Sequence, residues 1–144
     1  MSFRNPPAAA IRELLQKSRT IAVIGLSDDP ARPSHDVSCS MRDYGYRILP
    51  VNPKLTGWEG LPAYATLEAA SAALEPGERI DIVNVFRRPA QVDDVVEQCL
   101  RLRLPALWLQ LGVINETAAR RATDAGMTVV MDRCIYVDRA AMPD

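Results

Sequence analysis

The residues best suited to chemistry in this sequence follow Gly25, where a short apolar run gives way to the loop LSDDPARPS. Gly25 permits a tight turn, Ser27 offers a hydroxyl and a backbone N–H, and Arg32 offers a guanidinium that pairs well with phosphate. We predict a helix that opens at Ser34, whose hydroxyl is expected to cap its first turn. Free N–H groups at a helix start form an anion site. The loop therefore predicts phosphate binding, although it is not a good GxGxxG and an ordinary strand-ending turn is the alternative.

A second candidate is Lys54, in the segment Asn52-Pro53-Lys54 that follows the next predicted strand. NAD-binding domains usually place a carboxylate at this point to hold the ribose hydroxyls. The cation and the missing carboxylate argue against NAD and favour a nucleotide with an additional ribose phosphate, as NADP and coenzyme A both have. The alternative is a solvated loop lysine.

Further candidates follow the third and fourth main strands that we predict. Phe86, Arg87 and Arg88 come after the third strand, and Gln110 and Gly112 come after the fourth. The carboxyl ends of parallel strands line the binding crevice of an open α/β sheet, so these residues fall on the expected side. Phe86 can lie against a flat base and an arginine can pair with phosphate, while the other arginine is expected to be solvated.

Residues typical of catalysis are scarce. His35, the single histidine, lies at a predicted helix start, where the dipole disfavours its charged form, and we expect a loop contact rather than a base. Cys134 is the thiol nearest the predicted crevice, but the simpler expectation is that it is an unreactive small residue at a strand end. Asp132 and Arg133 are expected to form a local ion pair. We find no group of His, Cys and carboxylates with metal-ligand spacing.

The elements that must hold these residues alternate between helix and strand. Apolar residues at helical spacing predict helices over 8–17, 34–44, 89–102 and 116–125, with a short one over 66–74. Apolar runs predict main strands over 21–24, 46–51, 80–86, 106–111 and 127–131, with a short segment over 61–64 that pairs outside the second. The tail over 135–144 has no strong pattern. The alternation predicts an α/β fold, a single Rossmann-like doubly wound parallel sheet with main strand order 2-1-3-4-5 and helices on both faces.

Length and composition are those of one ordinary globular domain. The whole chain, 1–144, is expected to form a single nucleotide-binding domain, with the helix in 1–19 packed on it. A net charge of −1 gives no reason to expect nucleic-acid or membrane-surface binding, and no apolar run approaches the ~20 residues that cross a bilayer. The three cysteines are widely spaced and no signal peptide is recognisable, so we expect reduced thiols and a cytoplasmic location.

Five segments together carry a resemblance to a known family: IAVIGLSDDPARPS, ILPVNPK, VNVFRRP, LWLQLGVINE and VVMDRC. They occur in order at the predicted strand ends and resemble the small bacterial and archaeal CoA-binding proteins. That family is similar to the CoA-binding domain at the start of the succinyl-CoA synthetase alpha subunit. The resemblance implies a Rossmann-like fold that binds coenzyme A without catalysis. The catalytic histidine of the synthetase lies in a later domain that has no counterpart here, so synthetase activity is not implied.

The resemblance also implies roles for particular residues. The phosphates are expected at the first loop, and the ribose-phosphate end at the residues after the second strand. The adenine or the pantetheine arm is expected beside the end of the third strand, and the thiol near the end of the fourth. In that order, the implied residues are Gly25, Leu26, Ser27, Arg32 and Ser34; Pro53 and Lys54; Val85, Phe86 and Arg87; and Gln110, Leu111 and Gly112.

Coenzyme A or an acyl-CoA is therefore the expected ligand, and two other interpretations stay open. One is an NADP-linked enzyme or redox sensor, which the missing carboxylate after the second strand permits, although no hydride-transfer partner or acid–base group is visible. The other is a non-enzymatic protein-interaction module with an empty crevice, which predicts no stabilisation by any nucleotide.

Overall fold

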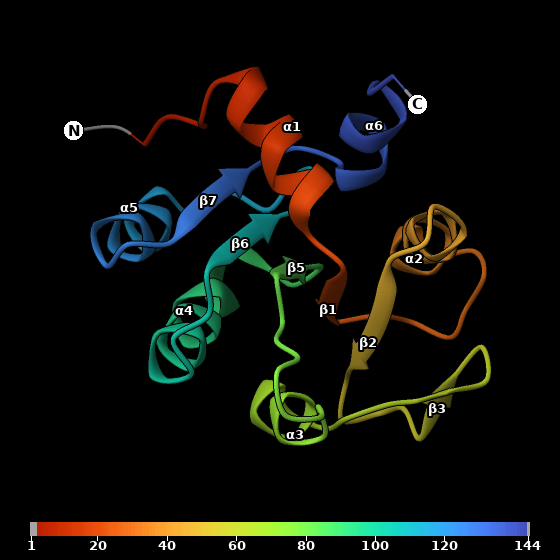
Figure 1. Cartoon of the computed structure of the whole chain (residues 1–144). Coiled ribbons are helices and arrows are strands. Elements are labelled where there is room, and N and C mark those ends of the chain that lie inside the picture. Colours follow the sequence, from red (N-terminus) through yellow and green to blue (C-terminus); the bar gives the residue numbers. More distant parts are fainter. Residues whose placement is uncertain (1–2, 144) are drawn as a thin grey trace.

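A parallel sheet of five strands forms the centre of the computed structural model, which describes residues 3–143 (Figure 1). The strand order is β2-β1-β5-β6-β7, which is the predicted order of main strands and confirms the Rossmann-like α/β fold. The strands are β1 Thr20–Ile24, β2 Arg47–Val51, β5 Ile82–Val85, β6 Ala106–Leu109 and β7 Thr128–Met131. The chain runs outward from β1 to β2 and then returns to β5. This reversal beside β1 creates the switch point at which such sheets bind ligands.

Within residues 3–143, six α-helices cover the sheet, three on each face (Figure 1). One face carries α1 Ala8–Lys17, α2 Pro33–Asp43 and α6 Ile135–Ala140. The other carries α3 Leu67–Ala72, α4 Val92–Arg101 and α5 Glu116–Asp124, with a 3₁₀ turn over Pro89–Gln91 that leads into α4. None of these helices has the length and apolar character that a membrane span needs.

Alternate residues of each strand feed two separate apolar cores. In β1, Ile21 and Val23 pack with α1, α2 and α6, whereas Ala22 and Ile24 pack with α3, α4 and α5. Every residue of β1 is buried, as expected for a central strand covered on both faces. Each large apolar side chain buried in this way contributes roughly 1.5–3 kcal/mol. The sheet is therefore a firm platform, and the ends of its strands are fixed in space.

Both edges of the sheet are closed by local contacts. Along β7, the Asn5 side chain donates to the Met131 carbonyl at 2.9 Å and accepts from the Met131 N–H at 2.7 Å, as a neighbouring strand would. Along β2, Pro50 has no N–H to donate, which suits an edge strand, and its carbonyl accepts from the Tyr64 N–H at 2.9 Å. Covered edges are poor templates for pairing with a second chain.

Three local predictions need correction. Ser34 is not the N-cap of α2, because Arg32 takes that position and Pro33 takes the first turn, where its fixed φ and missing N–H are harmless. The tail expected to lack a pattern forms α6, in which Ile135 is the buried residue. The short segment at 61–64 does pair outside β2, but only through Tyr64, which forms a bridge to Val51; β4 Leu61–Pro62 instead pairs antiparallel with β3 Gly57–Trp58.

At Gly25, the end of β1 meets the chain that leaves β5. The φ of Gly25 is +86°, and a Cβ at this position would lie 2.4 Å from the Phe86 carbonyl oxygen. The Gly25 N–H donates to the Val51 carbonyl at 2.9 Å, and the Phe86 N–H donates to the Ile24 carbonyl at 2.9 Å. The ends of β1, β2 and β5 are thus held together, and glycine is the residue that fits between them.

Replacing Gly25 with alanine is expected to lower the free energy of unfolding by more than the ~1–2 kcal/mol that a left-handed backbone costs a residue with a Cβ. The additional loss comes from the collision with the Phe86 backbone. Gly126→Ala is the matched control, since Gly126 has a φ of +101° but open space around its Cβ position. Urea unfolding of both variants measures the difference, and equal losses would contradict the collision.

Candidate functional site

A cleft of about 870 Å³ opens at the carboxyl ends of β1, β2, β5 and β6. Its walls are the loop after β1, the first turn of α2 and the segments that follow β2, β5 and β6. The cleft therefore lies at the switch point of the sheet, where the sequence predicts a ligand. Nine of the predicted residues line it: Gly25, Ser27, Arg32, Ser34, Lys54, Phe86, Arg87, Gln110 and Leu111.

The four other predicted residues do not line the cleft. Leu26 and Val85 are buried in the two cores beneath it, so their side chains support the loop and the end of β5. Pro53 and Gly112 are exposed neighbours of residues that do line it. The other lining residues are Pro33, Val37, Asn52, Arg88, Val113 and Cys134. Of these, Arg88 and Cys134 were considered from the sequence, but neither was given a ligand contact.

Positive charge dominates the cleft. Arg32, Lys54, Arg87 and Arg88 all line it, and no carboxylate does so among the residues that the structure describes. Nor does any of these four cations form an ion pair with a carboxylate in the range 3–143. A concentration of one sign of charge in a concave site attracts ligands of the opposite sign, here anions.

The loop after β1 is ordered by its own hydrogen bonds. The Ser27 N–H donates to the Ser34 Oγ at 3.0 Å, and the Asp29 N–H donates to the Ser27 Oγ at 3.0 Å. The Ala31 N–H donates to the Asp29 carboxylate at 2.9 Å. The amide of Ser27 is thus already used, and Ser34 holds the loop instead of capping the helix. Both hydroxyls keep a proton that they can donate into the cleft.

Asn52 joins the two phosphate-binding candidates and was not predicted to do so. Its side-chain N–H donates to the Leu26 carbonyl at 3.0 Å, and its side-chain oxygen accepts from the Lys54 N–H at 2.9 Å. The loop after β1 and the backbone of Lys54 are therefore held by one amide. The sequence signal is an Asn directly after a strand, a residue type that often bonds to backbone two residues on.

Gln110 lies on the cleft through a buried polar network. The Asn84 amide donates at 3.3 Å to the Gln110 Oε1, and the Ile135 N–H donates to the same oxygen at 3.3 Å. Gln110 is 6% exposed, so this oxygen is satisfied inside the protein and the Nε2 group is the part available to a ligand. The network joins β5, β6 and the start of α6, and it positions Gln110 without any contact from a ligand.

The ion pair expected between Asp132 and Arg133 is wrong. Arg133 instead donates two hydrogen bonds to the Asp138 carboxylate, at 2.8 and 2.6 Å. Asp138 lies on α6, which begins two residues after Arg133. Asp132 has a φ of +61°, and its carboxylate accepts from the Gly112 N–H at 2.8 Å. Gly112, predicted as a ligand contact, thus has its amide engaged by Asp132 and helps to fix the segment after β6.

The three thiols lie in different surroundings. Cys134 is half-buried and lines the cleft. Cys99 is fully buried in α4, and burial raises the pKa of its thiol to about 12. Cys39 is half-buried on α2, and burial also raises the pKa of its thiol. Because the thiolate is the reactive form, Cys99 is expected to be inert.

Comparisons with known proteins agree with this architecture. The sequence pattern of a family described as "CoA binding domain" matches residues 19–140. The chain is 45% identical over 138 residues to the uncharacterized protein YneT of Bacillus subtilis (strain 168), a match that covers 96% of this chain and 98% of that protein. Among solved structures, it is similar to cell-free ID.343 from Thermus thermophilus, with a TM-score of 0.83 and 38% identity over 94% of this chain and 98% of that one. A hypothetical protein from Pyrococcus horikoshii OT3 gives a TM-score of 0.84 and 27% identity over 97% and 96% of the two chains.

Iodoacetamide is expected to label Cys134 in the folded protein and to leave Cys99 unmodified. Cys134 lies at an open cleft, whereas the Cys99 thiol is buried and stays protonated at neutral pH. Peptide mass spectrometry after timed labelling measures each rate, and labelling in denaturant supplies the control in which all three cysteines react. Equal rates for Cys99 and Cys134 in the folded protein would contradict this arrangement.

Proposed function

The chain belongs to the CoA binding domain family, and we propose that its cleft binds coenzyme A or an acyl-CoA. The observation that carries the proposal is the set of four cations, Arg32, Lys54, Arg87 and Arg88, in a cleft whose described lining residues include no carboxylate. Coenzyme A carries a pyrophosphate and a ribose 3′-phosphate. Such a ligand needs several cations spread along one site, and arginine and lysine are the side chains that bind phosphate best.

The pyrophosphate is assigned to the space above Gly25. The Arg87 side chain passes over this glycine, since its Cδ lies 3.4 Å from the position that a Gly25 Cβ would take. Arg32 lines the same cleft, at the N-cap position of the eleven-residue helix α2. The positive end of the helix dipole adds to these two charges. Gly25, Arg32 and Arg87 all line the cleft, so the pyrophosphate is expected between the two arginines.

The ribose 3′-phosphate is assigned to Lys54. Asn52 accepts from the Lys54 N–H and also donates to the loop after β1, so the backbone of Lys54 has a defined position at the cleft. Phe86 is half-buried and lines the same cleft, and its ring is the aromatic surface that an adenine can contact. Each charged hydrogen bond of this kind contributes ~1.5–3 kcal/mol, so a few of them support micromolar affinity, about −8 kcal/mol, after the costs of binding.

The thiol end is assigned to the far side of the cleft, at Gln110, Leu111 and Cys134. Leu111 is 67% exposed, which leaves apolar surface for the pantetheine arm or for an acyl group. The Gln110 Nε2 can donate to a carbonyl of the same arm, because its Oε1 is held inside the protein. These contacts suit free and acylated coenzyme A alike.

We also propose that binding takes place without catalysis. The lining groups among the described residues are cations, amides, hydroxyls and one thiol, with no imidazole or carboxylate to act as a general base. His35 lies one residue after Ser34, but its ring faces Cys39 and Glu59 outside the lining. Gln110 neither accepts nor releases a proton in the physiological range. A hydrolase or transferase would need such a group beside the thioester.

Coenzyme A and acetyl-CoA are expected to raise the unfolding temperature, and NAD to have little effect. A ligand at about 100 times its dissociation constant stabilises the folded state by about 2.7 kcal/mol, which is several degrees for a domain of this size. Thermal unfolding with millimolar CoA, acetyl-CoA, dephospho-CoA, NADP and NAD in parallel makes the comparison. A shift with NADP alone would favour an NADP-linked enzyme or redox sensor. No shift with any ligand would favour a protein-interaction module.

Lys54→Glu is expected to lower the affinity for CoA by about 10–100-fold, the equivalent of one charged hydrogen bond at ~1.5–3 kcal/mol. The affinity for dephospho-CoA is expected to change little. The reason is that dephospho-CoA lacks the 3′-phosphate assigned to Lys54. Lys17→Glu is the matched control, because Lys17 is the other lysine of the chain and lies on α1 away from the cleft. Isothermal titration of both ligands gives the four affinities. If the Lys54 variant weakens both ligands equally, the assignment to the 3′-phosphate is wrong.

A further inference from the structure

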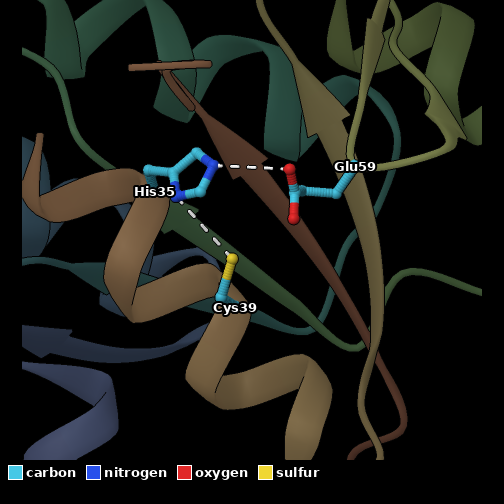
Figure 2. Close-up of side chains that lie close together, drawn as sticks. All are labelled: His35, Cys39 and Glu59. Carbon is cyan, nitrogen blue, oxygen red and sulfur yellow. Dashed lines mark hydrogen bonds and ion pairs between the residues drawn. The ribbon is translucent and has the colours of Figure 1, made fainter. Parts of the chain in front are cut away.

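Outside the cleft lining, three side chains with metal-binding atoms meet between α2 and the β3–β4 hairpin (Figure 2). His35 and Cys39 lie one turn apart on α2, and Glu59 comes from the turn of the hairpin. The imidazole Nδ1 is 3.7 Å from the Cys39 Sγ, and its Nε2 is 3.7 Å from the Glu59 carboxylate. One ligand atom from each residue lies within 4.8 Å of the other two. Sequence spacing did not predict this group, because Glu59 is brought to α2 by the fold.

We propose that His35, Cys39 and Glu59 bind a divalent transition metal ion of the zinc class. Thiolate, imidazole and carboxylate are the three ligand types that proteins offer to Zn²⁺, whereas Mg²⁺ and Ca²⁺ take oxygen ligands. In a tetrahedral site, Zn–S of ~2.3 Å and Zn–N of ~2.0 Å place the donor atoms about 3.5 Å apart. The His35 Nδ1 is already 3.7 Å from the Cys39 Sγ, so this nitrogen is the ring ligand, and the exposed Glu59 side chain moves to bring its carboxylate to that spacing. Water takes the fourth position.

The Glu59 carboxylate is held loosely by its present neighbours. It lies 3.7 Å from the His35 Nε2 and 3.9 Å from the Arg42 Nη1, and both distances exceed those of a hydrogen bond. Glu59 and Gly60 both have positive φ, 47° and 79°, and form the two central residues of a tight hairpin turn. A left-handed backbone is uncommon for glutamate, and here it presents the carboxylate to α2. Glu59 is therefore positioned, yet free to take a cation.

The imidazole is positioned more firmly. The side chain of His35 is 12% exposed, and its ring meets the Trp58 ring edge-on with centroids 5.4 Å apart. Trp58 is buried and its Nε1 donates to the Ser27 carbonyl at 3.2 Å. One ligand is thus held against a packed aromatic ring. Preorganisation of this kind reduces the ordering cost of binding an ion.

The Cys39 thiol must lose its proton to become a metal ligand. Burial is the main cause that raises the pKa of this thiol; Glu59, Asp43 and Asp36 also raise it, and Arg42 lowers it. When an ion binds, an S–metal bond replaces the S–H bond and the proton is released to the solvent.

Titration of the full chain with Co²⁺ tests the proposal, because Co²⁺ reports its ligands by absorption. We expect one equivalent to produce a thiolate-to-cobalt charge-transfer band in the near ultraviolet and the strong visible bands of tetrahedral Co²⁺, and we expect Zn²⁺ to remove both. The titration is made with a phosphine reductant to keep the three cysteines reduced without adding a competing thiol.

Two cysteine variants locate the ligand. Cys39→Ser is expected to lose the charge-transfer band, whereas Cys134→Ser is the matched control and is expected to keep it, since Cys134 lies at the cleft. Glu59→Gln is expected to weaken Co²⁺ binding by at least about 10-fold, the cost that even indirect partners of a metal ligand carry. Because Glu59 is exposed, this variant folds whatever happens to Cys39→Ser.

Three results would overturn the proposal. The first is the absence of a charge-transfer band in the unmodified chain. The second is a band that survives in Cys39→Ser or disappears in Cys134→Ser, which would place the thiolate elsewhere. The third is an unchanged Co²⁺ affinity in Glu59→Gln. None of these outcomes bears on coenzyme A binding, which the thermal comparison and the Lys54 variant decide separately.

Discussion

The arrangement of the whole cleft depends on the contact between Gly25 and the Phe86 carbonyl. A Cβ at Gly25 would lie 2.4 Å from that oxygen, so β1 and the chain leaving β5 approach as closely as they do because glycine stands at this point. The approach fixes where each segment leaves the sheet. It carries Arg87 over the glycine and directs the loop after β1 towards α2, where Arg32 stands at the N-cap position. One backbone contact thus helps to position two segments that each bring a cation to the same cleft.

The pairing of charged side chains differs between the cleft and the rest of the surface. Elsewhere, several arginines have a carboxylate partner, as in the pairs of Arg47 with Glu78 and Arg133 with Asp138. Such exposed pairs contribute about 0–1 kcal/mol to stability each, so their main effect is to neutralise local charge. In the described part of the chain, the four cleft cations have no such partner. A chain with a net charge of −1 therefore still presents a positive concave surface. An anion in that space removes repulsion between the cations as well as adding its own contacts.

The sequence predicted the features that depend on local pattern, and missed those that depend on a tertiary partner. A continuous apolar run ended by glycine identified β1, and apolar residues at helical spacing over 116–125 identified α5, Glu116–Asp124. Ser34 failed as a cap because its oxygen is engaged by Ser27 from across the loop. The six-residue helix α6 offers too few apolar positions for periodicity to show. The sequence predicts that the strand ends lie together, because the carboxyl ends of parallel strands share one edge of the sheet. It does not predict the hydrogen bonds of Asn52, because these depend on how close the loop after β1 lies to the segment after β2.

Trp58 connects the proposed metal site to the loop that lines the cleft. Its ring contacts His35, and its indole N–H holds the Ser27 carbonyl in the loop after β1. The hairpin that carries Trp58 also carries Glu59, so an ion that draws Glu59 towards α2 constrains the same turn that supports Ser27. If the bound ion favours the loop geometry that the anion requires, each ligand raises the affinity of the protein for the other. Thermodynamic reciprocity makes the two increases equal. If the ion draws the hairpin away from that geometry, the same argument gives equal mutual weakening. The coupling between ion and anion binding therefore passes through Trp58, because this side chain contacts both His35 and the loop after β1.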